Sequence, residues 1–254
     1  MRTVLVFLTL VTMTPAIGLM VIIASIFGVK DREGSIYDKA PRWWASLLVR
    51  AAGIRVRLHN EQLMRSGEPR IYLSNHVSWF DVLTLASVLP RYKFIGKAEL
   101  FRIPIFGRAA RAAGMIPIQR ENRKSAFESY RVAADRIRAG ASVVVFPEGT
   151  RGHSYALRQF KKGPFVLAVA AGVPIVPVVV HGTLHVMPRT TFRVRSGVVD
   201  IHFLEPIDAS GLTYEDRNRL SRAAWERVAD AMHELYGVES VMTTAPAREG
   251  AAAD

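Results

Sequence analysis

Short apolar segments recur along the chain and alternate with segments of helical periodicity. The strand-like runs lie at residues 54–58, 71–74, 93–95, 115–118, 142–146, 175–180 and 192–203. Helix-period stretches lie at residues 82–89, 126–139, 165–171 and 214–236. Such alternation is typical of a layered α/β domain, and we predict one such domain, with a central mixed sheet, over residues 54–237.

The N-terminal segment from Thr3 to Val29 contains no charged residue. As one helix it would be about 40 Å long, whereas the hydrocarbon core of a bilayer is about 30 Å thick. The run is longer than the apolar core of a secretory signal peptide, which is about 7–15 residues. Pro15 permits a kink, so a re-entrant helix and a full span are both consistent with the sequence.

A second helix is predicted near residues 41–53. It carries Trp43 and Trp44 beside Arg42 and Arg50. Tryptophan next to arginine favours the headgroup region of a membrane, and a core helix with two buried indoles is the alternative.

The flanking charges predict the orientation. Lys30 and Arg32 outweigh Arg2, which places the globular part in the cytosol by the positive-inside rule. We therefore predict membrane-embedded helices over residues 1–53, a cell-membrane location with the α/β domain facing the cytoplasm, and a disordered tail over 238–254.

Positive charge is concentrated in the first half of the chain. The formal net charge is +12, and residues 41–124 hold fifteen Lys and Arg against five acids. A basic face of this kind attracts anionic lipid, phosphorylated substrates or nucleic acid. The chain contains no cysteine, which excludes disulfides, thiolate zinc sites and a cysteine-bound intermediate.

A histidine and an aspartate lie five positions apart in the segment N-H-V-S-W-F-D, residues 75–81. His76 falls between a strand-like run and a helical run, and Asp81 falls in the first turn of that helix. An aspartate that accepts the Nδ1 proton leaves Nε2 free to take a proton from an alcohol. The alternative is a helix-capping Asp81 beside a hydrogen-bonded loop histidine.

The segment F-P-E-G-T-R, residues 146–151, follows another apolar run. Its carboxylate, turn and guanidinium suit the binding of a phosphate. Glu148 can bind a substrate hydroxyl or hold an arginine, and Gly149 permits a positive φ or a close backbone approach. His153, His181 and His185 have no partner pattern and are interpreted as structural.

These segments resemble the glycerolipid acyltransferases, specifically the PlsC-like 1-acylglycerol-3-phosphate O-acyltransferases. The resemblance covers about residues 70–182 and includes the further blocks K-A-E-L-F-R-I-P-I-F-G, G-M-I-P-I-Q-R and V-P-I-V-P-V, at 97–107, 114–120 and 173–178. It implies His76 as the catalytic base and Asp81 as its orienting group. It also implies a substrate-binding set that consists of Asn75, Lys97, Arg120, Glu148, Gly149, Thr150 and Arg151.

The implied reaction moves a fatty acyl group from acyl-CoA or acyl-carrier protein to the sn-2 hydroxyl of lysophosphatidic acid in the membrane. A thiol with a pKa of about 8.5 leaves as a thiolate, so neither a general acid nor a covalent enzyme intermediate is required. No cofactor or metal is expected.

Two alternatives remain open. One is a related acyltransferase that acts on another lysophospholipid or a lyso-aminolipid. The other is a non-catalytic protein that binds anionic membrane lipid. Nucleic acid is not an expected partner, because no recognition module accompanies the charge.

Overall fold

The fold is described from a computed structural model, which covers residues 1–64, 67–119 and 123–242, with only the backbone of 123–127. The described residues form a seven-stranded sheet in the order β1-β7-β6-β2-β5-β3-β4. The strands are β1 Ile54–His59, β2 Ile71–Ser74, β3 Tyr92–Lys97, β4 Ile116–Ile118, β5 Ser142–Val145, β6 Ile175–His181 and β7 Gly197–Phe203. Only β6 and β7 pair antiparallel. The predicted mixed sheet is confirmed.

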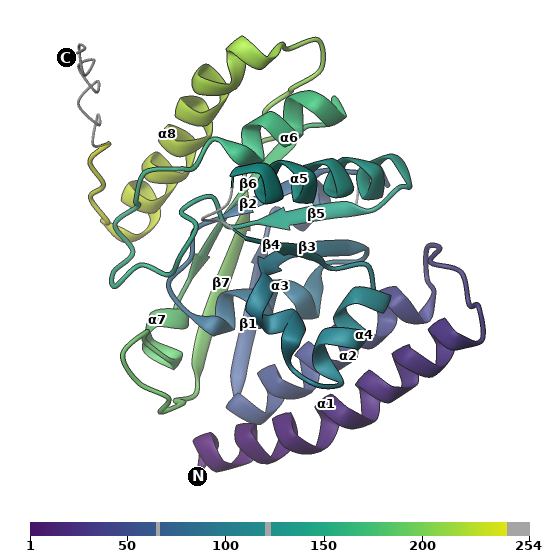
Figure 1. Ribbon diagram of the computed structural model, residues 1–254. Helices are drawn as coiled ribbons and strands as arrows, with labels where there is room; N and C mark the ends of the chain where they lie inside the picture. The colour runs from purple at the N-terminus through teal and green to yellow at the C-terminus, as the bar shows by residue number, and fades with distance from the viewer. Residues whose placement is uncertain (65–66, 120–122, 243–254) are drawn as a thin grey trace, which may run out of the picture.

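Helices cover both faces of this sheet (Figure 1). One face packs against α5 (Arg123–Arg138), α6 (Gly163–Ala171) and α8 (Arg217–Tyr236). The other face packs against α2 (Ile36–Ala52) and α3 (Trp79–Val88). The short helices α4 (Phe106–Ala112) and α7 (Thr183–Val186) follow β3 and β6, respectively, along the chain.

Alternation along the strands divides the apolar residues between the two layers. In β2, Ile71 and Leu73 belong to the core under α5 and α6, whereas Tyr72 belongs to the core under α2 and α3. All three are at most 2% exposed. Burial of a large apolar side chain stabilises the fold by about 1.5–3 kcal/mol, so a register slip of one residue would be costly on both faces.

The seventh strand begins later than the sequence predicts. Phe192 is 84% exposed, and the ladder with β1 starts at Gly197. Two backbone amides before that point have other partners, because Val194 donates to Thr3 Oγ1 and Arg195 to the Val186 carbonyl. The helix expected from residue 41 begins at Ile36, so Pro41 lies inside it. Helices α4 and α7 were not predicted, because their 7 and 4 residues are too short to show a period.

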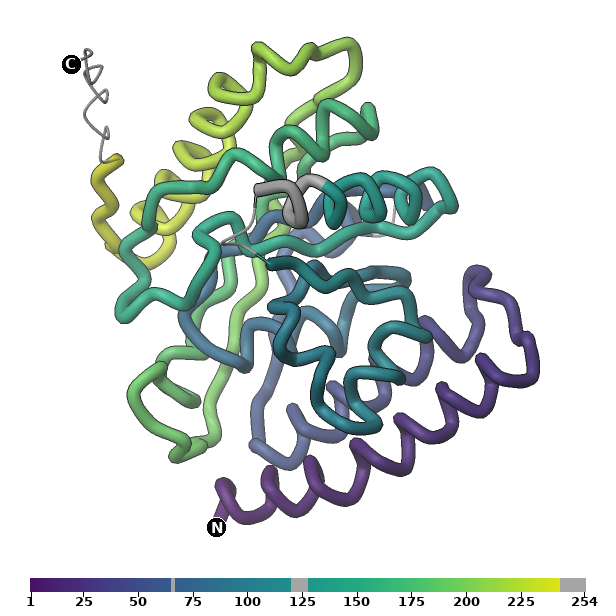
Figure 2. The backbone as a smooth tube through the Cα atoms, viewed as in Figure 1, coloured from purple at the N-terminus to yellow at the C-terminus, as the bar shows by residue number. Residues whose placement is uncertain are grey.

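The helix α1 (Arg2–Ile26) runs along the outside of α2 and α4 (Figure 2). Gly18 allows close packing there, since a Cβ at this position would lie 2.8 Å from Ile105 Cγ2. Trp44 donates a 2.9 Å hydrogen bond from Nε1 to Thr14 Oγ1. In the described chain, α1 alone has the length and apolar composition of a membrane span.

The second predicted membrane helix packs into the protein. Ala45, Val49 and Ala52 of α2 belong to the core between the sheet and α3, and Trp43 remains 49% exposed. The helix is therefore part of the core, but its two indoles are not both buried, since Trp43 is exposed and Trp44 is half-buried. The domain boundary at residue 53 and the membrane contact of Trp43 stay predictions.

Part of the positive charge assigned to a basic face is internal. Lys93 is fully buried and donates to the Ala113 carbonyl at 2.9 Å. Its Nζ lies 3.1 Å from Asp31 and 3.6 Å from Asp38, and Arg91 lies within 3.8 Å of the same two carboxylates. These two cations join the start of β3 to Asp31 of the α1–α2 connection and to Asp38 in the first turn of α2, and they do not attract external anions.

Candidate active site

The loop between β2 and α3 brings the imidazole of His76 to the carboxylate of Asp81. Ser78 caps the helix, with Oγ accepting from the Phe80 amide at 3.2 Å. Asp81, in the first turn, accepts from the Ser78 amide at 2.8 Å and completes a capping box. Because the backbone at Ser78 is extended (φ −140°, ψ 158°), His76 and Asp81 do not lie on one continuous helix, and their side chains can meet as the sequence predicts.

Asp81 is fully buried and accepts hydrogen bonds from four groups. Oδ2 lies 2.9 Å from His76 Nδ1 and accepts from the Val77 and Ser78 amides at 2.6 and 2.8 Å. Oδ1 accepts from the Thr183 hydroxyl. The carboxylate therefore assigns the proton of His76 to Nδ1 and makes Nε2 the acceptor.

The His76 ring packs against the protein but remains partly accessible to solvent. It stacks on Phe146 with centroids 4.1 Å apart, and its side chain is 13% exposed. In the described part of the chain, Nε2 has no hydrogen-bond partner. A partly exposed basic nitrogen beside a buried carboxylate can accept a proton from a bound alcohol.

The F-P-E-G-T-R turn and the glycine that follows it, Gly152, hydrogen-bond both the amide and the carbonyl of His76. The His76 amide donates to Glu148 Oε1 at 2.8 Å, and the His76 carbonyl accepts from the Gly152 amide at 2.7 Å. Gly149 adopts the expected positive φ of 78° within this turn. The two sequence blocks thus form one structural unit, which the sequence did not predict.

Glu148 has a different environment from the two that were anticipated. It is 3% exposed, and Oε2 accepts from the Arg158 amide at 3.3 Å. Among the described residues its carboxylate forms no ion pair with an arginine, and its observed role is to fix the loop. Burial raises its pKa to about 7, against the backbone hydrogen bonds from His76 and Arg158, which lower it.

This raised pKa predicts a pH-dependent stability. Between pH 4.5 and about 7, the unfolded chain has Glu148 ionised while the folded protein keeps it protonated. The contribution of Glu148 to the free energy of unfolding is therefore complete below pH 4.5, and it decreases by about 3 kcal/mol as the pH rises to 7. Urea unfolding of the wild type and Glu148→Gln at pH 5 and pH 8 measures it. The wild type should lose more free energy of unfolding than the variant, and parallel pH profiles would contradict the prediction.

Asn75 crosslinks two strand ends. Its side chain, 1% exposed, donates to the Val180 carbonyl at 3.0 Å and accepts from the Val180 amide at 2.8 Å. Both polar ends of the amide are used within the protein. Asn75 therefore positions the loop, and its contact with substrate stays a prediction without structural support.

Among the cations that the sequence predicts to bind phosphate, Arg151 directly precedes Gly152, whose amide binds the His76 carbonyl. Its guanidinium lies 5.1 Å from the Trp79 ring centroid. Arg189, which sequence reasoning missed, donates from Nη1 to the Arg151 carbonyl at 2.7 Å. Burial, and next the neighbouring Arg189 cation, lower the pKa of Arg151. Two cations adjacent to one another favour an anion between or beside them.

The remaining predicted phosphate ligands are placed less completely. Lys97 ends β3, is 57% exposed and lies 3.4 Å from Glu99. Thr150 is exposed in the turn. Arg120 lies outside the described residues. The structure therefore supports Arg151 near the histidine and leaves the rest of the phosphate set as a prediction.

Thr183 and Tyr155 were also missed by sequence reasoning. The Tyr155 hydroxyl accepts from the amides of Gly182 and Leu184 at 2.7 and 3.0 Å, which orders the start of α7. Thr183, itself fully buried, then reaches Asp81. Isolated Thr and Tyr residues carry no spacing signal, so only the fold reveals them.

A second histidine cluster lies on β1 and β7. His59, Asp200 and His202 place their ligand atoms within 4.8 Å of one another, a possible metal set. Asp200 already accepts two 2.7 Å hydrogen bonds from Arg57, and His202 Nε2 lies 2.6 Å from the Tyr236 hydroxyl. These polar groups are satisfied internally, and the cluster joins β1, β7 and α8.

Comparison with known proteins gives consistent matches. The Acyltransferase family profile matches residues 55–181. A 1-acyl-sn-glycerol-3-phosphate acyltransferase of Haemophilus influenzae is 34% identical over 194 residues, which cover 76% of this chain and 80% of that protein. A chloroplastic 1-acyl-sn-glycerol-3-phosphate acyltransferase of Brassica napus is 37% identical over 167 residues, 64% of this chain.

The matches to the chloroplastic relatives cover less than half of those proteins. The chain spans 48% of the Brassica protein and 42% of a chloroplastic relative from Arabidopsis thaliana. The crystal structure of the 1-acyl-sn-glycerophosphate acyltransferase PlsC from Thermotoga maritima has a TM-score of 0.78 with 24% identity. That match covers 94% of this chain and 97% of the other, and it shows a common fold.

Proposed function

This chain belongs to the Acyltransferase family, and from that membership we propose that it acylates the sn-2 hydroxyl of 1-acyl-sn-glycerol 3-phosphate to form phosphatidic acid. The relatives named above carry this activity in their names. An acyl thioester donates the fatty acyl group. The product places the enzyme in phospholipid biosynthesis.

The observation that carries the proposal is the hydrogen bond of 2.9 Å between His76 Nδ1 and Asp81 Oδ2. It fixes the tautomer in which Nε2 accepts the proton of the sn-2 hydroxyl. The resulting imidazolium is stabilised by the buried carboxylate. The freed alkoxide oxygen attacks the thioester carbon, the C–S bond breaks, and the thiol leaves as a thiolate.

The glycerol phosphate is assigned to cations beside this base. Arg151 offers a planar fork for two phosphate oxygens. Arg189 is adjacent to it and adds a second positive charge. Lys97 and Arg120 complete the proposed set by their positions in the family's sequence blocks. The reaction requires no cofactor beyond the acyl-CoA or acyl-carrier protein donor.

The site is proposed to face the cytoplasm at the cell membrane. Membrane association is supported by α1, whose outward side chains include Phe7, Val11 and Ile23, each at least 50% exposed, and the orientation rests on Lys30 and Arg32 outweighing Arg2. A helix with this surface is stabilised when lipid covers it. Lysophosphatidic acid would then reach His76 from the bilayer.

A panel of lysolipids tests the proposal. Purified protein in mixed micelles receives acyl-CoA with lysophosphatidic acid, a lysophosphodiester such as lysophosphatidylcholine, or a lyso-aminolipid, and products are identified by mass. We expect lysophosphatidic acid to react at least about 10-fold faster, because a phosphate monoester carries about 1.5–2 negative charges against one on a phosphodiester. Arg151→Ala should reduce that preference.

The alternatives predict different results. Faster acylation of another lysolipid, with preference unaffected by Arg151→Ala, would identify an enzyme with a different acceptor. Binding to anionic vesicles without any acyl transfer would identify a lipid-binding protein.

A further inference from the structure

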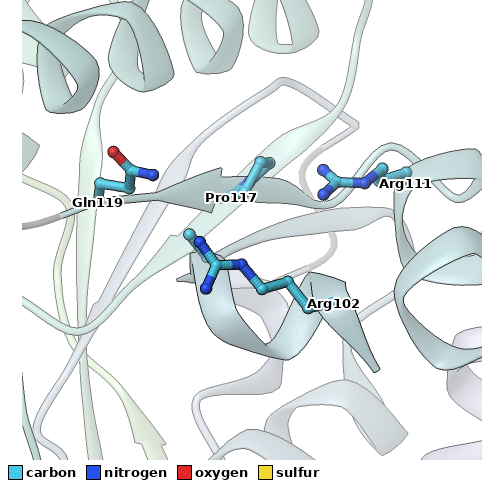
Figure 3. Close-up of a pocket in the computed structure, with 5 residues that line it drawn as sticks. Arg102, Arg111, Pro117 and Gln119 are labelled. Atoms are coloured by element: carbon cyan, nitrogen blue, oxygen red, sulfur yellow. The ribbon is translucent and has the colours of Figure 1, made fainter. Parts of the chain in front are cut away.

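A polar hollow lies at the outer edge of the sheet, away from His76. It has a volume of about 260 Å³ and is lined by Ala98, Arg102, Arg111, Pro117 and Gln119. Figure 3 shows Gln119 and Arg111 on either side of Pro117, with the Arg102 side chain below them. Three separate elements contribute, because Arg102 ends the turn after β3, Arg111 lies on α4 and Gln119 follows β4.

Neither arginine forms an ion pair with the residues that the structure describes, although Arg102 interacts electrostatically with Glu99, which itself lies 3.4 Å from Lys97. Neither Arg102 nor Arg111 forms a hydrogen bond or ion pair with a described group, and the Arg111 guanidinium lies 5.1 Å from the Phe101 ring centroid. Other arginines of this chain are neutralised, as Arg57 is by Asp200 and Arg91 by Asp38. Two guanidinium groups without an ion pair among the described residues, together with an amide around one hollow, favour an anionic ligand.

The hollow opens on the same face of the sheet as the His76 ring. Ile116 and Ile118 of β4 point into the core under α5, so the intervening Pro117 points to the opposite face. Phe94 lies on that opposite face, with its ring centroid 6.1 Å from Phe146. Phe146 in turn stacks on His76. A row of rings thus leads from His76 toward the edge of the sheet where the hollow lies.

The distance identifies which phosphate can reach the hollow. β4 is three strands from β2 through β5 and β3, which corresponds to about 14 Å at about 4.8 Å per strand. In lysophosphatidic acid about four bonds separate the sn-2 oxygen from phosphorus, or about 5 Å when extended. The acceptor phosphate therefore lies short of this hollow, and the side chains assigned to it, Lys97 and Arg120, would have to extend back toward His76 to meet it.

The acyl donor has the required length. In a phosphopantetheine arm about 13 bonds separate the sulfur from phosphorus, or about 15 Å when extended. We propose that the hollow between Arg102, Arg111 and Gln119 binds the phosphate of this arm, which acyl-CoA and acyl-carrier protein share. The inference rests on the proposed function and identifies residues that bind the acyl donor.

Steady-state kinetics with matched donors tests this assignment. Wild type, Arg102→Ala and Arg111→Gln are given acyl-CoA, acyl-carrier protein or S-acyl pantetheine, which lacks the phosphate. We expect the KM for both phosphorylated donors to rise about 10-fold or more, as for the loss of a charge-assisted hydrogen bond. The kcat, the KM for lysophosphatidic acid and the KM for S-acyl pantetheine should not change. Arg108→Ala, an exposed arginine on α4 outside the hollow, is the control and should behave as wild type.

Several outcomes would overturn the proposal. A higher KM for lysophosphatidic acid in the variants would assign the hollow to the acceptor. An equal rise in the KM for S-acyl pantetheine would show that the hollow does not bind the phosphate of the donor. An effect on acyl-CoA alone would assign the hollow to the nucleotide phosphates. Weaker binding to anionic vesicles without a KM change would assign it to a lipid headgroup.

A binding measurement separates this inference from the proposed function and from misfolding. Calorimetry with 4′-phosphopantetheine and with pantetheine requires no turnover, and the comparison of the two compounds on the wild type does not depend on the folding of any variant. Binding of the phosphorylated compound at least about 10-fold more tightly, and its loss in Arg102→Ala, would support the hollow even if no lysolipid were acylated. Equal affinity for the two compounds would refute the inference even in an active acyltransferase.

Discussion

Replacement of His76 by Ala is expected to reduce phosphatidic acid formation by about 10³-fold, within the 10²–10⁴ range of general base catalysis. An unactivated sn-2 hydroxyl attacks a thioester slowly, because its proton has no acceptor when the bond forms. No other described group can replace His76 as the base. The other buried carboxylate of the site, Glu148, is occupied because it accepts hydrogen bonds from the His76 and Arg158 amides. The measurement is the initial rate of product formation at saturating donor and acceptor.

The control is a histidine of similar chemistry in another setting. His185 is exposed at the end of α7, and His185→Ala should retain the wild-type rate. Circular dichroism and thermal unfolding establish whether His76→Ala is folded, and its KM for lysophosphatidic acid should stay within about threefold of wild type. A folded His76→Ala protein with more than a tenth of the wild-type rate would disprove the role of His76 as base.

The local features of the site could be predicted from the sequence. His76 and Asp81 are five residues apart, and Ser78 and Asp81 have the spacing of a capping box, so short-range geometry determines their contact. The seven strand-like runs all became strands, because alternating or continuous apolar residues in β2, β5 and β6 face two helical layers.

The long-range features could not be predicted in this way. Glu148 and Gly152 hydrogen-bond to the His76 backbone although they lie 72 and 76 residues after it in the sequence. Thr183 hydrogen-bonds to Asp81 over a separation of 102 residues. Such contacts depend on the order of β2, β5 and β6 in the sheet, which hydrophobic periodicity does not encode. The buried charge of Lys93 was missed for the same reason, since Asp31 and Asp38 lie more than 50 residues before it.

Replacement of Asp81 by Asn is expected to lower acyl transfer by about 10²–10⁴-fold with little loss of stability. An amide oxygen at the Oδ2 position can still accept from the Val77 and Ser78 amides, and the new NH2 group can donate to the Thr183 hydroxyl once that hydroxyl rotates. The hydrogen bonds of the loop are thus retained while the negative charge is lost. The imidazolium that forms during the reaction then lacks its buried counter-ion.

Thr183→Val provides the matched comparison, because it keeps the Asp81 charge and removes only the hydroxyl donor. The loss of one hydrogen bond to a charged group, about 1.5–3 kcal/mol, predicts a decrease in rate of at most about 100-fold and a comparable loss of stability. Urea unfolding and initial rates of both variants, measured at the same pH, separate the two effects. If Asp81 acts through its charge, Asp81→Asn is the slower enzyme and the more stable protein of the pair. The reverse order, with Thr183→Val slower, would show that the carboxylate matters only for the shape of the loop.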